Sequence, residues 1–354
     1  MPTRSWSFVP DSAPRSGDLP RVWVLLGEGA GGNAQMLALA EALGWPYETR
    51  QLSWNVLNYL PNPLIGAHRF TLDRSADALR PPWPDLVIGA SRRSAPIARW
   101  IKKQSGGRTK LVHLLHTQMP LHYFDLVVTL AQFRVPNAPN VLRNTLPLNV
   151  IDPADQAQAA ERWRARLEDL PRPWIAVLVG GNSSSYTLDT TTAARLGREA
   201  DAAAQAVGGS LLVTTSRRTP AAAADALAAA IAAPAEIYRW RPDDPDNPYG
   251  AFLALADRFI VTGDSASLPA EAVATGRPVT LFEWPANKPV RRPKGLAGHL
   301  YRGLIYSGWL KPRRDFAAFH DMLRRAGLVD AETTGAMPDD MATTVARIRA
   351  LFVN

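Results

Sequence analysis

Short apolar runs alternate with helix-like stretches through the first half of this 354-residue chain. The runs fall at residues 21–26, 85–88, 109–115 and 125–130, and residues 47–52 are a further candidate strand. Helical patterns follow two of them, at residues 34–43 and 95–103. Continuous apolar runs separated by helices are typical of parallel strands that are covered on both faces. The pattern predicts a Rossmann-like α/β domain over residues 21–150.

The same pattern begins again at residue 174. Its apolar runs fall at residues 174–179, 210–214, 236–240, 259–261 and 279–282. They predict a second Rossmann-like domain over residues 174–330, which faces the first across a cleft. We interpret residues 151–173 as a linker, and we expect a C-terminal helix within residues 331–354 to pack back on the first domain. The Pro/Ser/Arg-rich residues 1–20 predict a disordered tail.

The chain carries 40 basic and 32 acidic residues, and only six of the basic residues are lysines. The net charge of +8, mostly from arginine, suits a phosphorylated substrate or an anionic membrane surface. No dense basic tract with interleaved aromatic residues occurs, so nucleic acid is the least favoured partner. Cysteine is absent, which excludes disulfides and cysteine nucleophiles. Without a signal peptide or an apolar run of about 18 residues, we expect a cytoplasmic protein, with a peripheral place at the inner membrane as the alternative.

One stretch of the second half, residues 259–282, predicts a strand, a polar turn, a helix and another strand. It reads F-I-V-T-G-D-S-A-S-L-P-A-E-A-V-A-T-G-R-P-V-T-L-F. Asp264 and Ser265 are typical helix N-cap residues, and the free N–H groups of such a helix start favour a phosphate. Ser267 and Glu271 lie four residues apart on one helix face, where a carboxylate is placed to hold ribose hydroxyls. The alternative is an ordinary βαβ crossover with a capped helix.

Three polar turns of the second half follow predicted parallel strands, so their ends meet at one sheet edge, where ligands of open α/β sheets bind. The turns are G-G-N-S-S-S-Y, T-T-S-R-R-T-P and T-G-D-S-A-S-L-P-A-E. Glycines allow close backbone approach, hydroxyl and amide groups donate hydrogen bonds, and two arginines can neutralise a diphosphate without a metal. The candidate donor-binding residues are Gly180, Gly181, Asn182, Ser183, Ser216, Arg217, Arg218, Thr219, Gly263, Asp264, Ser265, Ser267 and Glu271. A metal held by the D-x-D pair Asp244 and Asp246 is the less favoured alternative.

The first half has its own Gly-rich turn, G-E-G-A-G-G-N, between a strand and a helix. It lacks the G-x-G-x-x-G spacing of a dinucleotide site, so we expect it to approach an acceptor or a substrate phosphate. The candidate acceptor-side residues are Gly29, Gly31, Gly32, Asn33, Arg92 and Arg93.

Two side chains of the first half are candidates for the general base of a transfer reaction. Glu28 lies within the Gly-rich turn, and His116 follows a strand in a turn that we expect to face the cleft. We prefer His116 to His113, although a histidine at a strand end is more often structural. For Glu28 the alternative is a solvated turn carboxylate, and for Arg92 and Arg93 a solvated charge pair.

The stretch V-T-G-D-S-A-S-L-P-A-E-A-V-A-T-G-R-P-V resembles the donor-site signature of GT-B glycosyltransferases, and most of all that of the enzyme that adds N-acetylglucosamine to form lipid II. Glu271, Gly276 and Pro278 match the spacing of that signature. The resemblance implies that Glu271 holds the ribose of UDP and that Ser265 and Ser267 lie on the phosphate side. This chain has Asn33 where that enzyme has a histidine.

A wider resemblance covers most of residues 21–285. The motifs G-E-G-A-G-G-N, V-I-G-A-S-R-R-S-A, L-H-T-Q-M-P, G-G-N-S, T-T-S-R-R-T-P and T-G-D-S-A-S together are similar to those of the "elongated mitochondria" fission family. Its bacterial members are usually described as candidate glycosyltransferases. Its plant members are known as peripheral proteins of the outer mitochondrial membrane that recruit a dynamin-like GTPase.

Together these features predict an inverting, metal-independent transferase with no cofactor, which moves a sugar from a nucleotide-diphosphate donor to an envelope or lipid-linked acceptor. The donor binds the second domain and the acceptor the first, where Trp54 and Tyr59 are candidates to face a lipid-linked or membrane acceptor. One alternative is a non-enzymatic adaptor of the same fold that binds a protein partner at a membrane surface. Another is a non-hydrolysing nucleotide-sugar epimerase, for which no clear carboxylate and histidine set can be assembled.

Overall fold

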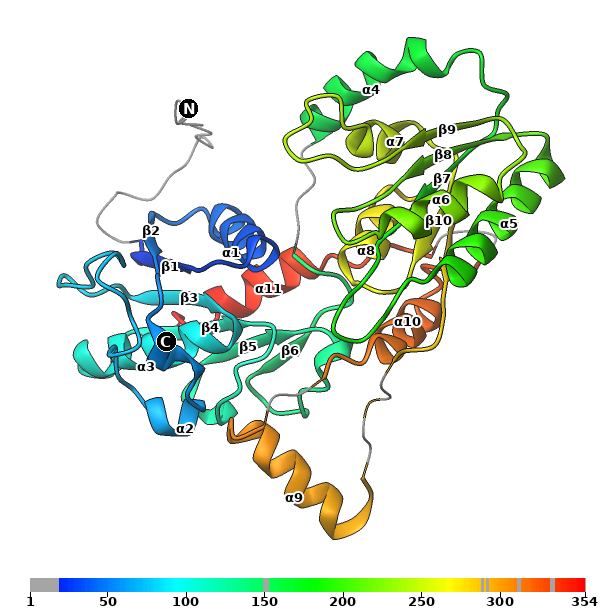
Figure 1. The fold of residues 1–354 in the computed structure, drawn as a ribbon. Coiled ribbons are helices and arrows are strands. Elements are labelled where there is room, and N and C mark those ends of the chain that lie inside the picture. The colour runs from blue at the N-terminus through cyan, green and yellow to red at the C-terminus, as the bar shows by residue number, and fades with distance from the viewer. Residues whose placement is uncertain are drawn as a thin grey trace.

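The protein forms two α/β domains, each built on one parallel sheet with helices on both faces (Figure 1). The structure is a computed structural model, and it describes residues 19–148, 153–287, 290, 293–310, 313–331 and 335–353. Residues 1–18 of the expected tail lie outside the described residues. The predicted α/β class with two Rossmann-like domains is confirmed.

The first sheet has the strand order β2-β1-β3-β4-β5-β6, with every neighbouring pair parallel. Its strands are β1 (Val22–Leu26), β2 (Tyr47–Gln51), β3 (Leu86–Ala90), β4 (Lys110–Leu114), β5 (Leu126–Thr129) and β6 (Val141–Arg143). Its helical segments are α1 (Ala30–Leu43), η1 (Val56–Tyr59), α2 (Asn62–Ile65), α3 (Ser91–Gln104), η2 (Leu121–Tyr123) and η3 (Ala131–Phe133). The three-residue strand β6 has no sequence signal, because it is too short to form an apolar run and pairs only at the sheet edge.

The second sheet has the order β11-β10-β7-β8-β9. Its strands are β7 (Trp174–Leu178), β8 (Ser210–Thr214), β9 (Ala235–Tyr238), β10 (Arg258–Thr262) and β11 (Val279–Phe282). The helices that precede or separate them are α4 (Pro153–Leu167), α5 (Thr190–Val207), α6 (Ala221–Ala229), α7 (Tyr249–Leu255) and α8 (Ser267–Ala274). Three more follow, α9 (Gly295–Tyr306), α10 (Phe316–Arg325) and α11 (Asp340–Arg349).

The helix α4 corrects the interpretation of residues 151–173 as a linker. Ala159, Ala160, Trp163 and Leu167 are buried in one core cluster with Trp174 and Phe252 of the second domain. The Trp163 and Phe252 rings meet edge to face with centroids 5.7 Å apart. The charged residues that suggested a linker lie on the other helix face, so α4 is a covering helix of the second sheet.

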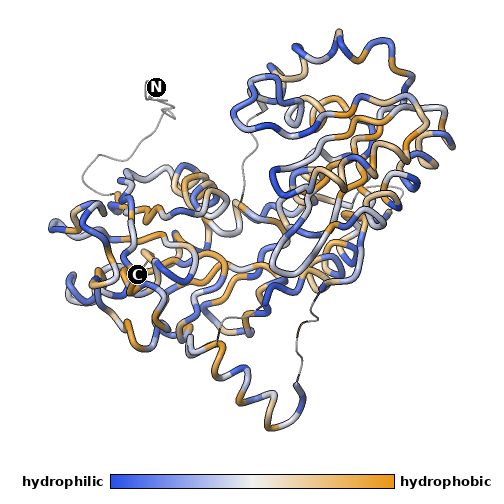
Figure 2. Tube along the Cα trace, viewed as in Figure 1, coloured by the Kyte–Doolittle hydropathy of each residue, from blue (hydrophilic) through white to orange (hydrophobic). Residues whose placement is uncertain are grey.

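Each sheet is buried between two apolar clusters, one on each face. Hydrophobic residues accordingly gather along the strands in Figure 2. The strands β3, β7 and β8 are buried at every position, which is why they read as continuous apolar runs rather than alternating ones.

The C-terminal part of the chain crosses back to the first domain. Val345 and Ile348 of α11 join the core cluster that contains α1 and β1. The side chain of Asn144 donates a hydrogen bond of 3.0 Å to the Thr344 hydroxyl, 200 residues further along the chain. The last helix is therefore part of the first domain. None of the described helices is long and apolar enough to cross a membrane.

Replacing Ile348 with alanine should destabilise the first domain by about 2–5 kcal/mol, because the side chain is fully buried between α11 and the first sheet. Urea unfolding followed by tryptophan fluorescence would measure the change. Val353→Ala is the matched control, because that side chain is 77% exposed. Equal, small effects of the two substitutions would contradict the assignment of α11 to this core.

Acid should destabilise the protein through His113, a fully buried residue of β4. Burial lowers the pKa of His113 to about 3, so the folded chain keeps the ring neutral while the unfolded chain protonates it near pH 6.5. Stability is therefore lost as the pH falls from about 6.5 towards 3, by about 2 kcal/mol at pH 5. Urea unfolding at pH 7.5 and 5.0 should show a smaller loss for His113→Leu than for the unmodified chain. An equal loss in both proteins would refute this assignment.

Candidate functional site

Both sheets change the direction of strand addition at one point, and polar turns follow the strands on either side of it. In the first sheet this switch lies between β1 and β3, and in the second between β7 and β10. At such a point the two connections leave the sheet in opposite directions and open a crevice, which is where open α/β sheets bind ligands. The structure thus places two candidate half-sites, one in each domain.

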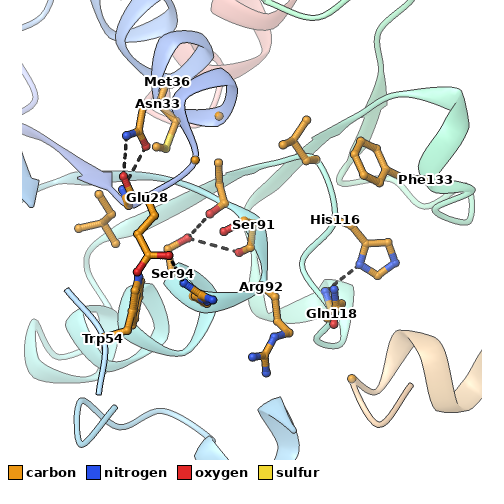
Figure 3. A pocket seen from close by; sticks show the side chains of 18 of the residues that line it. Glu28, Asn33, Met36, Trp54, Ser91, Arg92, Ser94, His116, Gln118 and Phe133 are labelled. Carbon is orange, nitrogen blue, oxygen red and sulfur yellow. Dashed lines mark hydrogen bonds and ion pairs between the residues drawn. The ribbon is translucent and has the colours of Figure 1, made fainter. Parts of the chain in front are cut away.

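The first-domain half-site is a cavity of about 780 Å³ at the carboxyl ends of β1, β3 and β4 (Figure 3). Its walls come from the first turns of α1 and α3, from the loops after β2 and β4, and from the chain after α9. The lining includes Glu28, Gly29, Gly32, Asn33, Arg92, Arg93 and His116 from the predicted set, together with Trp54 and Tyr59. Gly31 is part of the first turn of α1.

The Gly-rich turn after β1 is shorter than expected, because α1 begins at Ala30 rather than at residue 34. Asn33 closes the turn: its amide nitrogen donates to the Gly27 carbonyl at 2.7 Å, and its amide oxygen accepts from the Gly27 N–H at 3.0 Å. With both polar atoms bound to the backbone, Asn33 braces the turn rather than offering itself to a ligand. Gly29, the N-cap of α1, provides no side-chain cap.

Arginines at the start of α3 have unequal roles. Arg92 donates to the backbone carbonyls of Leu60 at 2.7 Å and of Asn58, so it anchors the loop that carries η1. Arg93 forms an ion pair with Glu28 across the cavity, with 2.7 Å between Nη1 and Oε2. The Glu28 side chain is 68% exposed, which leaves its carboxylate accessible from the cavity. Glu28 and Arg93 remain candidate ligand groups, whereas Arg92 has a structural role.

The imidazole of His116 has the wrong tautomer for the predicted general base. Its Nδ1 accepts a hydrogen bond of 2.9 Å from the Gln118 backbone N–H, so in the neutral ring the proton sits on Nε2. Burial also lowers the pKa of His116 to about 4, because a charged ring would lose its hydration. A neutral ring with Nε2–H donates a hydrogen bond and does not accept a proton. We therefore assign His116 a donor or packing role.

Backbone strain gathers around this cavity. Ser91, Leu115 and Gln118 line it and have φ values of 70°, 73° and 47°. Residues other than glycine rarely adopt this left-handed conformation, because it costs of order 1–3 kcal/mol for each residue. Such strain persists where the surroundings over-determine the conformation, and it clusters at functional sites.

The second-domain half-site brings three turns into contact. Gly180 after β7 donates its N–H to the Thr262 hydroxyl at 2.7 Å. The Gly181 N–H donates to Asp264 Oδ2 at 3.1 Å, and the Arg218 guanidinium approaches the same oxygen at 2.6 Å. A Cβ on Gly181 would lie 2.2 Å from the Arg218 carbonyl oxygen, so only glycine allows this approach.

Most hydroxyl groups of the predicted donor set hold these turns together. Ser216 donates to the Gly180 carbonyl at 2.8 Å, and Thr219 donates to the same oxygen. The Ser183 hydroxyl accepts from the Tyr186 N–H at 3.2 Å, within its own turn. The Asn182 amide oxygen accepts from the Leu188 N–H at 2.9 Å. These four side chains use their hydrogen bonds to fix the shape of this sheet edge.

The start of α8 differs from the predicted capping. The helix begins at Ser267, its N-cap is Ala266, and no side chain caps it. Asp264 is instead buried against Gly181 and Arg218, and the Ser265 hydroxyl is buried without a hydrogen-bond partner among the described residues. The free N–H groups of the first turn therefore stay open to an outside acceptor.

Glu271 is not brought beside the three turns. It accepts a hydrogen bond from the Tyr249 hydroxyl, and burial raises its pKa. It lines a separate cavity of about 310 Å³ between α8, the end of the first domain and the start of α11. The predicted ribose ligand therefore faces its own recess one helical turn from the α8 start.

Three residues that the motifs did not single out also contribute to the two half-sites; they are Arg314, Glu283 and His320. Arg314 lines the first-domain cavity with its guanidinium 5.7 Å from the centroid of the Phe133 ring. Burial and the positive charge of Arg218 lower the pKa of Arg314. In the described chain no carboxylate forms an ion pair with Arg314. Its only sequence signal is its place in a basic segment after residue 287.

The pair formed by His320 and Glu283 supports the T-G-D-S turn. His320 Nδ1–H donates to Glu283 Oε1 at 2.5 Å, and Arg324 pairs with the other oxygen. These bonds from His320 and Arg324 lower the pKa of Glu283 to about 2. A Cβ on Gly263 would lie 2.5 Å from His320 Cε1. The glycine of the signature is required by this ring, so Gly263 is a packing residue.

No group of three or more His, Asp or Glu side chains that could hold a metal occurs within the described residues. Asp244 accepts from the Tyr238 hydroxyl at 2.8 Å and from the Asp246 N–H at 2.9 Å. The two carboxylates of the D-x-D thus face separate partners in a loop that does not line the first-domain cavity.

Comparisons with known proteins place the chain in a family. The model of the family described as "Mitochondrial fission ELM1" matches residues 30–335. The Mitochondrial fission protein ELM1 of Arabidopsis thaliana is 30% identical over 218 residues, 55% of this chain and 51% of that protein, so the chain spans about half the length of this relative. An uncharacterized protein of Rickettsia prowazekii (strain Madrid E) is 26% identical over 298 residues, 75% of this chain and 84% of that protein.

Among solved structures, the UDP-GlcNAc 2-epimerase of Methanocaldococcus jannaschii has a TM-score of 0.49 at 10% identity, covering 94% of this chain and 99% of that one. MurG of Acinetobacter baumannii has a TM-score of 0.43 at 15% identity, covering 95% and 91%. The family match covers most of the chain, including all three turns of the second-domain half-site. The chain therefore belongs to the Mitochondrial fission ELM1 family.

Proposed function

We propose that this protein is a metal-independent glycosyltransferase that uses a nucleotide-diphosphate sugar. The observation that carries the proposal is the pairing of two half-sites: polar turns lie at the switch point of each sheet, and Arg314 from the C-terminal part of the chain lines the cavity of the first domain. Transferases need two substrates held side by side, and this arrangement offers a place for each.

The donor diphosphate would bind at the start of α8. No side chain caps the N–H groups there, the Ser265 hydroxyl has no hydrogen-bond partner among the described residues, and Ser267 and Arg217 are exposed. Arg314 would neutralise the diphosphate as it leaves, which replaces the metal that other transferases use. Glu271 would hold the ribose from its recess along the same helix.

The acceptor would bind in the first-domain cavity, with Glu28 as the general base. The Glu28 carboxylate takes the proton of an acceptor hydroxyl, whose oxygen forms a bond to the anomeric carbon. The bond from that carbon to the diphosphate breaks on the opposite face, and the nucleoside diphosphate leaves with the electron pair. Arg93 orients Glu28 through their ion pair, and His116 donates a hydrogen bond. The acceptor would be an envelope or lipid-linked molecule, met at the cytoplasmic surface of the inner membrane.

A non-enzymatic adaptor is the second candidate, and one contact favours it. The Gly181 N–H and the Arg218 guanidinium are groups that could bind a phosphate, but both already bind the Asp264 carboxylate. An adaptor would keep this internal anion and would bind a protein partner instead of a nucleotide.

Titration calorimetry with UDP-, GDP- and CMP-sugars should detect binding of one of them, and Arg314→Gln should weaken it about 10- to 100-fold, since a charge-assisted hydrogen bond contributes about 1.5–3 kcal/mol. Arg172→Gln is the matched control, because Arg172 pairs with Asp257 just before β7 and β10 begin, at the opposite edge of the second sheet. Absence of binding by every nucleotide sugar would favour the adaptor.

The role of Glu271 can be separated from that of its neighbour. If Glu271 holds the ribose, Glu271→Ala should weaken binding of the responding nucleotide at least tenfold, through loss of hydrogen bonds to a carboxylate. Tyr249→Phe should preserve it, because this change frees the carboxylate from its hydrogen bond. Calorimetry on both variants decides, and unchanged affinity in Glu271→Ala would remove Glu271 from the donor site.

A further inference from the structure

We propose that the first-domain cavity and the apolar surface at its mouth form one site for an amphiphilic acceptor, a hydrocarbon chain joined through a phosphate or diphosphate to the group that bears the accepting hydroxyl. The inference rests on the proposed function in one respect, the assignment of this cavity to the acceptor. It goes further by naming the chemistry of the acceptor and the surface that would hold its hydrocarbon chain.

The inner part of the site suits an anionic head group. Arg93 and Arg314 line the cavity, and Glu28 is the only carboxylate in its lining. The first turns of α1 and α3, both without a side-chain cap, also face it. His116 adds a buried ring, 5% exposed, whose Nε2 has no hydrogen-bond partner among the described residues. Guanidinium groups and free backbone N–H groups are the donors that bind phosphate.

The outer part of the site is apolar. Thirteen large hydrophobic side chains of the described chain are exposed, and eight of them lie on two segments beside this cavity. We call these eight the apolar rim; they are Val56, Leu57, Tyr59 and Leu64 on η1 and α2, and Leu296, Leu300, Trp309 and Leu310 on α9 and the turn after it. Exposed apolar groups gathered in this way mark a binding surface rather than chance exposure.

The two segments of the apolar rim meet at the cavity. A Cβ on Gly308 would lie 2.2 Å from the Gln118 carbonyl oxygen and 3.2 Å from Pro63, so the end of α9 packs against α2. Tyr59 and Trp309 belong both to the rim and to the cavity lining. The basic interior therefore continues directly into the apolar exterior.

The helix α9 extends this surface away from the domains. It projects from the lower edge of the molecule in Figure 1, and hydrophobic residues recur along it in Figure 2. Leu296 and Leu300 are 87% and 66% exposed and lie four residues apart, hence on one helix face. The 12-residue helix is about 18 Å long, enough to follow a hydrocarbon chain of more than ten carbons.

Charge identifies the occupant. Residues 284–314, which contain α9, include eight basic residues and no Asp or Glu, and residues 53–72 contain no Asp or Glu either. In the described parts of these two segments the charged side chains are all basic, and an apolar surface flanked by positive charge complements a molecule that is both hydrocarbon and anionic. A protein partner or a second copy of this chain would place neutral or mixed charges there, and both are outcomes of the test.

Calorimetry with three probes tests the proposal: dodecyl phosphate below its micelle concentration, inorganic pyrophosphate, and dodecyl glucoside. We expect dodecyl phosphate to bind at least tenfold more tightly than either of the others. The double variant Leu296→Ser, Leu300→Ser should lower that affinity about tenfold and leave pyrophosphate affinity within twofold. Arg93→Gln should weaken both phosphate-containing probes and leave the glucoside unchanged. Val207→Ser with Val353→Ser, two exposed positions away from the rim, is the matched control.

Each other outcome overturns the proposal. Equal binding of the glucoside means a surface for any hydrocarbon, and equal binding of pyrophosphate means a site for free phosphate. Concentration-dependent dimers in sedimentation that the leucine variants abolish mean a contact between copies. The probes contain no nucleotide, so binding of dodecyl phosphate without binding of any nucleotide sugar contradicts the proposed function alone. The reverse result contradicts only this inference.

Discussion

The buried carboxylate of Asp264 is the interaction on which the ligand edge of the second domain depends. It accepts from the Gly181 N–H and pairs with Arg218, so it joins the turns after β7, β8 and β10. A buried carboxylate is tolerated only when it is paired and hydrogen-bonded, and losing one partner costs several kcal/mol. The three turns therefore stabilise one another, and together they fix the position of the uncapped start of α8.

The two half-sites differ in how their charged side chains are paired. The Asp264 carboxylate is paired with Arg218 of its own domain, whereas no carboxylate of the described residues forms an ion pair with Arg314. An anion that reaches the first-domain cavity would be stabilised by Arg314. The same sign of charge continues around the apolar rim. Both half-sites thus favour negatively charged molecules, although they come from different sheets.

The histidines illustrate how little a residue type says about its role. His116 and His113 lie three residues apart at one strand end, and both are kept neutral by burial. The bond from the Gln118 N–H to Nδ1 decides that His116 is a donor. His320 donates from Nδ1 to Glu283 and fills the space beside Gly263. The role of His116 follows from a backbone N–H two residues away, and that of His320 from a carboxylate 37 residues away.

Much of the fold could be predicted from local pattern. Continuous apolar runs marked most strands of both sheets, but not the polar edge strand β2 or the three-residue β6, and glycines such as Gly276 marked helix ends. The limits of helices were less accurate: α1 and α3 begin directly after their strands, in turns whose glycine and serine content suggested loops. The helix α4 was taken as a linker because its charged face is as prominent in the sequence as its buried one.

The sequence by itself determined which residues could meet at the two sheet edges. The reason is that all strands of a parallel sheet run in the same direction, so the turns that follow them lie at the same edge. Tertiary structure decided what those residues do. It assigned Ser216, Thr219 and Asn33 to bracing, separated Glu271 from the three turns, and brought Arg314 and α9 to the first-domain cavity. The physical reason is that a buried polar atom forms a hydrogen bond with whichever partner lies next to it in the folded chain. That partner is set by the packing of distant segments, whereas strand and helix positions are set by the local run of apolar side chains.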